Sequence, residues 1–474
     1  MAPVDHVKAV VGRLRATFES GRTRPLDYRK RQLTRLSEMI RENEEALCDA
    51  VWKDLRRGRR ETVAFETQFV QNEIQTALSQ LDSWARPQKV SRECDLAQGF
   101  DAAFVQKQPI GVVAVLSTWN FPLQLALVPL VSAIAAGNTA VVIQPTRTVY
   151  NSVAALAKLV PLYLDEEAYA VLDYRLYGIT ELLRHRVDHL FLAGKTASDG
   201  VFAVAAIRHL TPVTLELGGR SPCFVDHETV DMAVVAERIA RAKFVNCGAT
   251  CTAPSYVLVE EAGLDALVRA LRSALLQLYG DDPQKSDHYS RFDGPREFQL
   301  KEELRRATKG KVAHGGRTDA SDLYMEPTLL VDVPRDDVLM NEHVFGPLLP
   351  LVTVKSVDDA IGLVRSKGKL ETLYVFSDDD PLVAKLLEGT TSGHYVVDDT
   401  RQNMLHDGLP FAGSLSGIGS FCGRAGFDAF SNSVSVLRRG LKLDSAICWI
   451  GASSWLDGAR KGQKGPTGGA LVRL

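Results

Sequence analysis

The spacing of apolar residues along the chain predicts alternating helices and strands. Two opening segments, at about 7–18 and 33–47, carry apolar residues at helical spacing. Further on, a continuous apolar strand at 112–116 leads into an apolar helical stretch that ends near Gly137, and a second strand follows at 140–143. This order predicts a β-α-β unit of a parallel sheet, in which ligands bind at the carboxyl ends of the strands.

A second alternating series begins near Gly219. Before it, the pattern indicates a helix at 181–184 and a strand at 189–192 that ends in a turn at Gly194. The second series consists of two predicted strands, at 223–225 and 256–259, and two predicted helices, around 232–242 and at 264–278. Strands that alternate with helices are typical of α/β proteins, so we expect two α/β units in one chain.

Composition narrows the class of protein. The chain has 474 residues, of which 45% are hydrophobic and 24% charged, with a formal net charge of −2. These values fit a large soluble protein of more than one domain and give no basic excess for binding nucleic acid. The longest membrane-span candidate, Leu125 to Ala136, is shorter than the ~20 apolar residues that a membrane helix needs, and it contains Pro129. No integral membrane segment is therefore expected.

The seven cysteines and the N-terminus indicate the compartment. The cysteines are odd in number, scattered, and without the paired spacing of a zinc site. The first residues have no apolar core followed by a cleavage site, so no secretion signal is predicted. We expect a cytoplasmic protein with neither structural disulfides nor a metal site.

Three side chains suggest covalent chemistry on a carbonyl. Cys251 lies in a turn of small residues, 246–254, just beyond the amphipathic helix. Glu216 lies in an apolar run closed by two glycines, where desolvation would raise its pKa toward that of a working general base. Asn120 follows the first strand and is a possible hydrogen-bond donor to an oxyanion. Together they predict a thiol nucleophile with a base and an oxyanion donor.

Plainer interpretations exist for each group. A lone cysteine is most often a buried, inert thiol, so Cys251 could be part of the core. Cys247 would lie about one helical turn before it if the helix continues, and it is a second thiol in the same segment. Glu216 could be a buried carboxylate that pairs with a neighbour for structural reasons.

Several motifs in order along the chain resemble the aldehyde dehydrogenases, and within them the class 3 group. The resemblance spans roughly residues 5 to 435 with little insertion or deletion. The matching runs are HLTPVTLELGG (209–219), SPC (221–223), NCGATCTAPSY (246–256), LYGDDPQ (278–284), VFGPLLPLV (344–352), LPFAG (409–413) and FDAFS (427–431).

The resemblance implies a fold and a division into domains. It implies an α/β fold with a Rossmann-type cofactor domain, an α/β catalytic domain and a small oligomerisation element, in a chain that forms a homodimer. The Gly-rich, basic stretch after residue 438 matches nothing in the family, and its composition predicts disorder. The expected ranges are 1–83 with 107–217 for the cofactor domain, 218–395 for the catalytic domain, 84–106 with 396–438 for oligomerisation, and 439–474 for the tail.

The resemblance also assigns roles to site residues. The nucleophile is the second cysteine of the motif, Cys251, and Cys247 is assigned to packing. Glu216 activates water, while the Asn120 side chain and the Cys251 N–H stabilise the oxyanion. The residues expected to hold the dinucleotide, NAD or NADP, are Trp119, Gln144, Arg147, Gly194, Lys195, Gly218, Gly219, His343 and Phe345.

The cofactor residues depart from the family pattern. Gln144 and Arg147 stand where the family has the lysine and the glutamate that hold the adenosine ribose. Because arginine has donors only, Arg147 predicts either affinity for the 2′-phosphate of NADP or weaker binding of both dinucleotides. Asp199 replaces a glycine beside the phosphates and Lys195 adds a compensating charge, while His343 replaces the glutamate that binds the nicotinamide ribose.

Two hypotheses for function follow. The first is NAD(P)-dependent oxidation of aldehydes, medium- to long-chain aliphatic or aromatic, to carboxylic acids through a cysteine thiohemiacetal and a thioester. These aldehydes would include products of lipid metabolism. The alternative is a degenerate homologue with impaired cofactor binding that acts as a binding, structural or esterase-like protein. The first is favoured because Asn120, Glu216 and Cys251 all remain.

Overall fold

The computed structural model describes residues 3–90, 102–144, 148–173, 179–194, 207–368, 370–400, 409 and 417–438. The chain divides into two compact units, 1–85 with 107–432 and 86–106 with 433–474. The described part of the second unit belongs to a three-stranded sheet of β1 (Gln88–Lys89), β2 (Ala102–Pro109) and β18 (Ser431–Arg438). The domain ranges expected from the sequence stay a prediction, and the tail from 439 to 474 lies outside the described residues.

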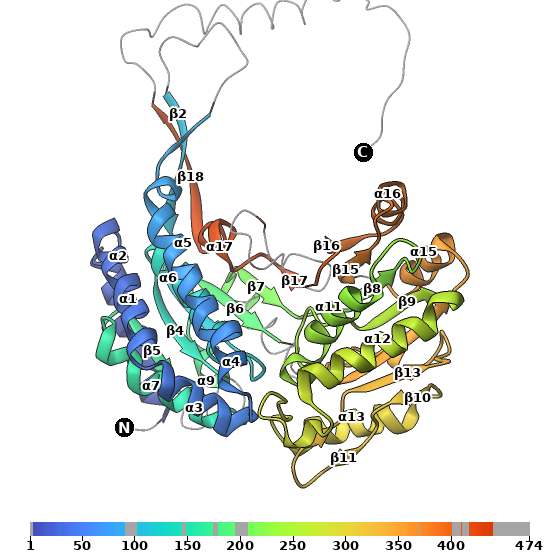
Figure 1. The fold of residues 1–474 in the computed structure, drawn as a ribbon. Coiled ribbons are helices and arrows are strands. Elements are labelled where there is room, and N and C mark those ends of the chain that lie inside the picture. The colour runs from blue at the N-terminus through green and yellow to red at the C-terminus, as the bar shows by residue number, and fades with distance from the viewer. Residues whose placement is uncertain are drawn as a thin grey trace, which may run out of the picture. The chain divides into compact units, whose positions relative to one another are not determined.

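A six-stranded sheet carries the predicted β-α-β unit (Figure 1). Its neighbours are parallel except at one edge, where β17 runs antiparallel to β7. Helix α6 (Gln124–Ala136) joins the two predicted strands, β3 and β4, at the centre of the sheet. The order is β17 (Gly417–Ile418), β7 (Val213–Glu216), β6 (His189–Ala193), β3 (Val112–Leu116), β4 (Thr139–Ile143) and β5 (Tyr169–Leu172).

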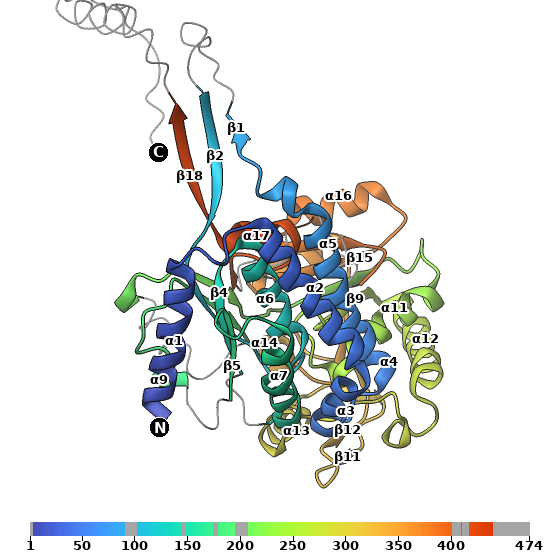
Figure 2. The ribbon, with the colours of Figure 1, turned by 90° about the vertical axis from the view of Figure 1, so that its left-hand side faces the viewer.

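Both faces of this sheet are covered, which explains why its strands read as unbroken apolar runs. Val112, Ala114 and Leu116 pack on one face with α1 (Pro3–Glu19). Val113 and Val115 point to the other face and join a core with the helices on that side. Figure 2 shows α1 on one side of β4 and β5, with α6 and α7 (Tyr150–Tyr163) on the other.

The helical pattern at 33–47 divides between two helices, where the sequence suggested one. Helix α2 (Leu26–Glu42) ends at Asn43, whose side chain Nδ2 donates to the Met39 carbonyl at 2.8 Å, and α3 (Glu44–Leu55) begins directly after it. An asparagine side chain that satisfies a carbonyl at a helix end favours this break. Three further elements follow before the second unit: α4 (Arg59–Thr62), the π-helix η1 (Val63–Thr67) and α5 (Gln68–Trp84).

The predicted helix at 181–184 forms as α9 (Ile179–Leu182), two residues earlier than expected. It is a single turn, and its Glu181 side chain lies 2.8 Å from Arg184, the last residue of the expected range. A short amphipathic pattern of this kind locates a helix without fixing its ends.

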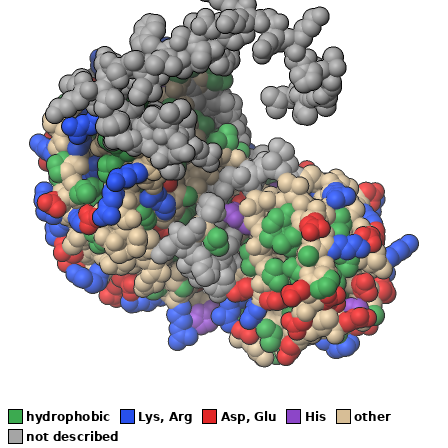
Figure 3. Space-filling model, turned by 90° about the horizontal axis from the view of Figure 1, so that it is seen from above, with side chains coloured by type: hydrophobic (Ala, Val, Ile, Leu, Met, Phe, Trp, Pro, Cys, Tyr) green, Lys and Arg blue, Asp and Glu red, His purple; other side chains and the backbone are tan. Residues whose placement is uncertain are grey.

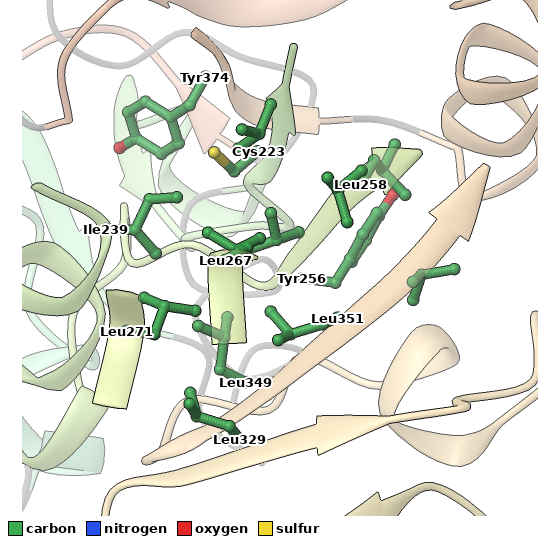
Figure 4. Packing of buried hydrophobic residues seen from close by; sticks show 14 of the residues in the cluster. Cys223, Ile239, Tyr256, Leu258, Leu267, Leu271, Leu329, Leu349, Leu351 and Tyr374 are labelled. Carbon is green, nitrogen blue, oxygen red and sulfur yellow. The ribbon is translucent and has the colours of Figure 1, made fainter. Parts of the chain in front are cut away.

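A seven-stranded sheet forms the second half of the first unit. It is parallel except at one edge, where β10 runs antiparallel to β13. Helices α11 (Met232–Phe244) and α12 (Glu261–Tyr279) pack on it, and Figure 4 shows Ile239 and Leu267 of these helices among strand residues such as Leu258. The order is β10 (Lys311–His314), β13 (Thr328–Val331), β14 (Leu348–Val354), β9 (Tyr256–Glu260), β8 (Pro222–Val225), β15 (Leu370–Phe376) and β16 (Ser392–Val397).

The remaining elements surround these sheets. They are the 3₁₀ helices η3 (Val245–Gly248) and η4 (Pro283–Lys285), the helices α13 (Pro295–Ala307), α14 (Val338–Asn341), α15 (Val357–Ser366), α16 (Asp380–Gly389) and α17 (Gly423–Ala429), and the strands β11 (Thr318–Asp319) and β12 (Tyr324–Met325).

Within the described ranges, no helix is both long enough and apolar enough to cross a membrane. On the face seen in Figure 3, acidic and basic side chains are interspersed over the described surface. This distribution matches the near-neutral net charge of the sequence.

Candidate active site

A cavity of about 1040 Å³ in the first unit collects most of the predicted site residues. A volume of this size is at the upper end of small-molecule sites and can hold more than one ligand. The predicted residues on its wall are Trp119, Asn120, Gly194, Glu216, Gly218, Gly219, Cys251, His343 and Phe345. The carboxyl ends of parallel strands β3, β6 and β7 therefore converge on one cavity, as the β-α-β pattern predicts.

Cys251 lies on this wall because the helix before it stops early. Helix α11 ends at Phe244, and residues 246 to 248 all take positive φ values, 52° at Asn246, 53° at Cys247 and 76° at Gly248. A Cβ atom at Gly248 would lie 2.4 Å from the backbone of Gly346, so the turn requires glycine there. Cys247 is thereby directed into the core of the seven-stranded sheet, with its sulfur 3.7 Å from the Tyr289 hydroxyl, while Cys251 is left partly exposed.

The glycines after Glu216 allow two distant segments to approach. Gly218 has φ of 66°, and a Cβ atom on it would lie 3.3 Å from Cβ of Cys251 and 3.6 Å from Cε1 of His343. A larger residue at this position would be strained by its backbone and crowded against both side chains. The conformation of Gly218 thus keeps the thiol close to the strand end that carries Glu216.

Glu216 is the last residue of β7, where its backbone carbonyl accepts from the Gly194 N–H at 2.7 Å. Its side chain lines the cavity, yet Oε1 is buried and has no hydrogen-bond partner. Burial, followed by the charge of Glu371, raises the pKa of Glu216 well above its usual value. The direction agrees with the sequence prediction, since desolvation disfavours the charged carboxylate.

The Cys251 thiol is neutral in this arrangement. Burial raises its pKa to about 12, and the carboxylates of Glu371 and Glu216 add to the shift. The backbone N–H groups of Thr252 and Cys251 act in the opposite direction, because they stabilise a negative sulfur. Since the thiolate is the reactive form, Cys251 needs a proton acceptor or a change in its surroundings before it attacks a substrate.

Asn120 is buried beside the turn that carries Cys251. Its Nδ2 donates to the Ala249 carbonyl at 3.1 Å, and its Oδ1 is buried without a partner. An amide nitrogen carries two protons, so one remains for a further acceptor in the cavity. The geometry is compatible with an oxyanion donor, and that role stays a prediction.

A buried hydrogen-bond network holds the backbone of Asn120 in place. Arg57 is fully buried, pairs with Glu66 at 2.6 Å, and donates to both the Asn120 carbonyl and the Asn246 side chain. Asn246 in turn donates to the Asn120 carbonyl at 2.7 Å and to the Ala249 carbonyl at 3.1 Å. Because each member has partners, the network ties the segment after β3 to the turn that carries Cys251.

Aromatic side chains line the part of the cavity where the sequence predicts the nicotinamide. Trp119 and Phe345 meet edge to face with ring centroids 5.7 Å apart, and the His343 ring lies 5.4 Å from Phe345. Gly194 has φ of 85°, and a Cβ atom there would lie 3.2 Å from Cβ of Thr118. The backbone at the end of β6 thus comes close to the end of β3 only because residue 194 has no side chain.

Gln144, expected to hold the ribose, does not line this cavity, whereas Asp293 does. Gln144 at the end of β4 donates from Nε2 to the Thr118 carbonyl at 2.6 Å, and its Oε1 is buried and unpartnered. Asp293 lines the cavity and also has a buried, unpartnered oxygen, Oδ1. Buried acceptors are normally satisfied, so the Asp293 oxygen fits a ligand with hydroxyl donors, as the riboses of a dinucleotide are. Arg147, Lys195 and Asp199 lie outside the described residues.

Sequence reasoning did not find Arg57, Glu66, Glu371 or Asp293. Arg57 lies in a run of arginines that reads as a solvated surface, and Glu66 is an ordinary acidic residue in a helical pattern. Glu371 is only 3% exposed. The sequence hinted at its burial in one way, because it is an acidic residue within the apolar run of β15. No sequence pattern predicts that Asp293 contacts the loop after β4.

The fold and the site together define a class, a two-sheet α/β enzyme with a cysteine presented to a dinucleotide-sized cavity. The model of the aldehyde dehydrogenase family matches residues 1–436 of this chain. The chain belongs to the aldehyde dehydrogenase family. It is an oxidoreductase that oxidises aldehydes with NAD or NADP.

Several relatives match almost end to end. Aldehyde dehydrogenase family 3 member B1 from Bos taurus is 42% identical over 90% of each chain. The protein named aldehyde dehydrogenase, dimeric NADP-preferring, from Canis lupus familiaris is 39% identical over 93% of this chain and 96% of its own. The solved structure of Staphylococcus aureus AldH in a substrate-bound state has a TM-score of 0.90 and 30% identity, over 96% of this chain and 99% of its own. These matches confirm the predicted family and α/β fold, and none of these relatives is described as a degenerate homologue.

Proposed function

We propose that Cys251, Glu216 and Asn120 carry out aldehyde oxidation in the cavity between the two large sheets. The dinucleotide supplies the nicotinamide ring that accepts a hydride. The observation that carries the proposal is the convergence of these three side chains, from three separate segments, on one cavity wall. A nucleophile, a base and an oxyanion donor within one cavity are the set that covalent catalysis on a carbonyl requires.

In the first stage the Cys251 sulfur attacks the aldehyde carbon and forms a thiohemiacetal. The thiol first loses its proton to solvent, because the thiolate is the reactive form. The second Nδ2 proton of Asn120 and the Cys251 N–H then stabilise the oxyanion. As the C–O bond regains its double-bond character, a hydride leaves the carbon and a thioester to Cys251 remains.

In the second stage water hydrolyses the thioester. Glu216 accepts a proton from the attacking water, and the C–S bond breaks to release the carboxylic acid and the free thiol. The unpartnered Oε1 of Glu216 supports this role, because a base needs a lone pair that no protein group occupies. Net, one aldehyde and one water become one carboxylic acid, with one hydride removed to the dinucleotide and one proton released to solvent.

The apolar wall of the cavity supports medium- to long-chain aliphatic or aromatic aldehydes, among them aldehydes from lipids. Phe65 and Phe69 line it from η1 and α5, and Phe121, Leu125 and Phe421 line it from other segments. Each buried CH₂ group is worth about 0.8 kcal/mol, so KM should fall by roughly fourfold per added carbon until the cavity is filled. A series of straight-chain aldehydes measures this dependence.

We further propose a homodimer in the cytoplasm. The name of the canine relative includes the word dimeric, and the five cysteines in the described ranges are all free thiols. Sedimentation equilibrium at several protein concentrations measures the oligomeric state, and a monomer at all concentrations would contradict the homodimer.

The direct test of function is a titration of the purified protein with NAD and with NADP, followed by aldehyde turnover with each. Reduced cofactor and carboxylic acid should appear in equal amounts. Absence of turnover with both dinucleotides, in a protein that binds them, would contradict the proposal.

A further inference from the structure

Asp293 brings a carboxylate from the second half of the unit to the loop that follows β4. The Thr148 hydroxyl donates to Asp293 Oδ2 at 2.7 Å, and Asp293, Gly294 and Thr148 all line the cavity. A Cβ atom on Gly294 would lie 3.4 Å from the Thr148 methyl group, so Gly294 lies next to the Thr148 side chain. Asp293 Oδ1 is buried and has no partner in the protein.

The position of the Asp293 carboxylate relative to β4 indicates what it could bind. In doubly wound α/β folds an acidic residue just beyond the second strand of the first β-α-β unit binds the adenosine ribose 2′-hydroxyl. Here β3, α6 and β4 form that unit, and the residue after β4 is Gln144, an amide. In the described part of the chain, the Asp293 carboxylate accepts a hydrogen bond from Thr148 of the loop after β4, on the cavity wall.

We propose that Asp293 binds the 2′-hydroxyl of the adenosine ribose and thereby favours NAD over NADP. The inference rests on the proposed function and adds a specificity residue to it. A carboxylate oxygen accepts a hydrogen bond from a hydroxyl, and it repels the phosphate that replaces this hydroxyl in NADP.

The charge of Asp293 is present under ordinary conditions. Burial is the main cause that raises the pKa of Asp293 to about 6, the Thr148 hydrogen bond opposes the shift, and Glu297 adds to it. The carboxylate is therefore mostly ionised at neutral pH. A buried anion with one free oxygen gains from a hydroxyl partner, because a charged hydrogen bond offsets part of its desolvation.

Calorimetry at neutral pH on the full chain tests the assignment with three probes: NAD, NADP and the NAD analogue whose adenosine ribose lacks the 2′-hydroxyl. Asp293→Asn should weaken NAD binding by about 10- to 100-fold, the range for one charged hydrogen bond. It should weaken binding of the deoxy analogue much less, and the ratio of the NADP to the NAD dissociation constants should fall by about the same factor. This comparison is a double-mutant cycle between the side chain and one hydroxyl.

Two further variants keep the test decisive. Thr148→Val leaves the charge and removes the hydrogen bond that orients Asp293, so it should shift the same ratio in the same direction by a smaller factor. Glu303→Gln removes an exposed carboxylate of the same helix, α13, that does not line the cavity, and should leave the ratio unchanged.

Equal losses for NAD and its deoxy analogue, an unchanged ratio in Asp293→Asn, or an equal shift in Glu303→Gln would each overturn the assignment while the proposed function stands. Failure of the unaltered protein to bind either dinucleotide would overturn the proposed function first.

Discussion

The two ends of the cavity differ in what holds their polar groups in place. At the thiol end, Arg57, Glu66 and Asn246 form buried hydrogen bonds that fix Asn120 and the turn before Cys251. At the end expected to hold the ribose, Asp293 is oriented by a hydrogen bond from Thr148. Buried oxygens without a partner occur at both ends, on Glu216 and Asn120 and on Asp293.

The two ends have different tasks in an enzyme, one to stabilise the transition state and the other to bind an exchangeable cofactor. Groups that stabilise a transition state work best when they are oriented before the substrate arrives, and a satisfied network gives that orientation. Groups that hold an exchangeable cofactor must keep free hydrogen-bonding capacity until it binds. In the sequence, Asn120, Glu216 and Cys251 match the pattern expected from the resemblance, whereas Gln144 and Arg147 depart from it, so cofactor choice is the property that the resemblance predicts least.

The largest expected effect follows from removing the sulfur. Cys251→Ala should reduce both aldehyde oxidation and ester hydrolysis to background, because both reactions use the same thiolate. Cys247→Ala is the matched control, since its thiol lies in the core, and it should retain most of the activity per folded molecule. Activity that survives in Cys251→Ala and disappears in Cys247→Ala would move the nucleophile to the earlier cysteine.

Replacing the base should separate the two stages. Glu216→Gln keeps the shape of the side chain and removes its basicity, so steady-state turnover should fall by about 10²- to 10⁴-fold. A first-turnover burst of reduced cofactor should survive, because hydride transfer precedes hydrolysis. Rapid-mixing absorbance measures both phases. Loss of the burst together with the steady state would show that Glu216 activates the thiol or holds the fold.

Breaking the network behind Asn120 should affect stability more than any exposed ion pair does. Arg57→Met leaves Glu66 buried without its partner, which should cost about 3–5 kcal/mol in the free energy of unfolding. Arg59→Ala removes an exposed pair with Glu44 in the same segment and should cost less than about 1 kcal/mol. Urea denaturation of both variants gives the comparison. Similar costs in the two would mean that the buried pair does not fix this end of the cavity.

The raised pKa of Cys251 predicts a pH dependence for the cofactor-free protein. Only the thiolate reacts with iodoacetamide, and a pKa of about 12 leaves a small thiolate fraction at neutral pH. That fraction, and hence the rate at Cys251, should rise by about tenfold per pH unit across the mildly alkaline range. Peptide mass mapping assigns the rate to Cys251. A rate that is already constant with pH near neutrality would mean that the thiol is ionised at rest.

The smallest expected effect concerns Arg147, which lies outside the described residues. If its guanidinium pairs with the 2′-phosphate, Arg147→Glu should weaken NADP binding by about one to two decades without weakening NAD, because the family has a ribose-binding glutamate at this position. The predicted roles of Arg147 and Asp293 act in opposite directions on the same ratio. An unchanged ratio in Arg147→Glu would identify Arg147 as a solvated surface charge.

Sequence reasoning predicted the parts of this molecule that depend on local pattern. The strands at 112–116 and 140–143 are apolar on both faces, and they form β3 and β4 within one residue of the expected bounds. The raised pKa of Glu216 followed from an apolar run and two glycines. Positive φ values at Asn246 and Cys247 could not be predicted, because neither residue requires them. The close approach of Gly248 to the Gly346 backbone is a tertiary contact that the sequence does not reveal.

The contacts between distant segments could not be predicted. Arg57 reaches Asn246 across 189 residues of sequence, and Asp293 meets Thr148 across 145. Side chains such as these read as surface charges until the fold buries them. The periodicity of a single sequence predicts local helices and strands, and it does not show which distant residues are in contact.

The central claim is that Cys251 holds the substrate as a thioester that Glu216 hydrolyses. The most direct measurement is intact and peptide mass spectrometry of Glu216→Gln after mixing with an aldehyde and a dinucleotide. We predict an acyl group on Cys251 that requires both the aldehyde and the dinucleotide and is absent from Cys251→Ala. An acyl group on Cys247, or no covalent adduct in a variant that still releases a burst of reduced cofactor, would contradict the claim.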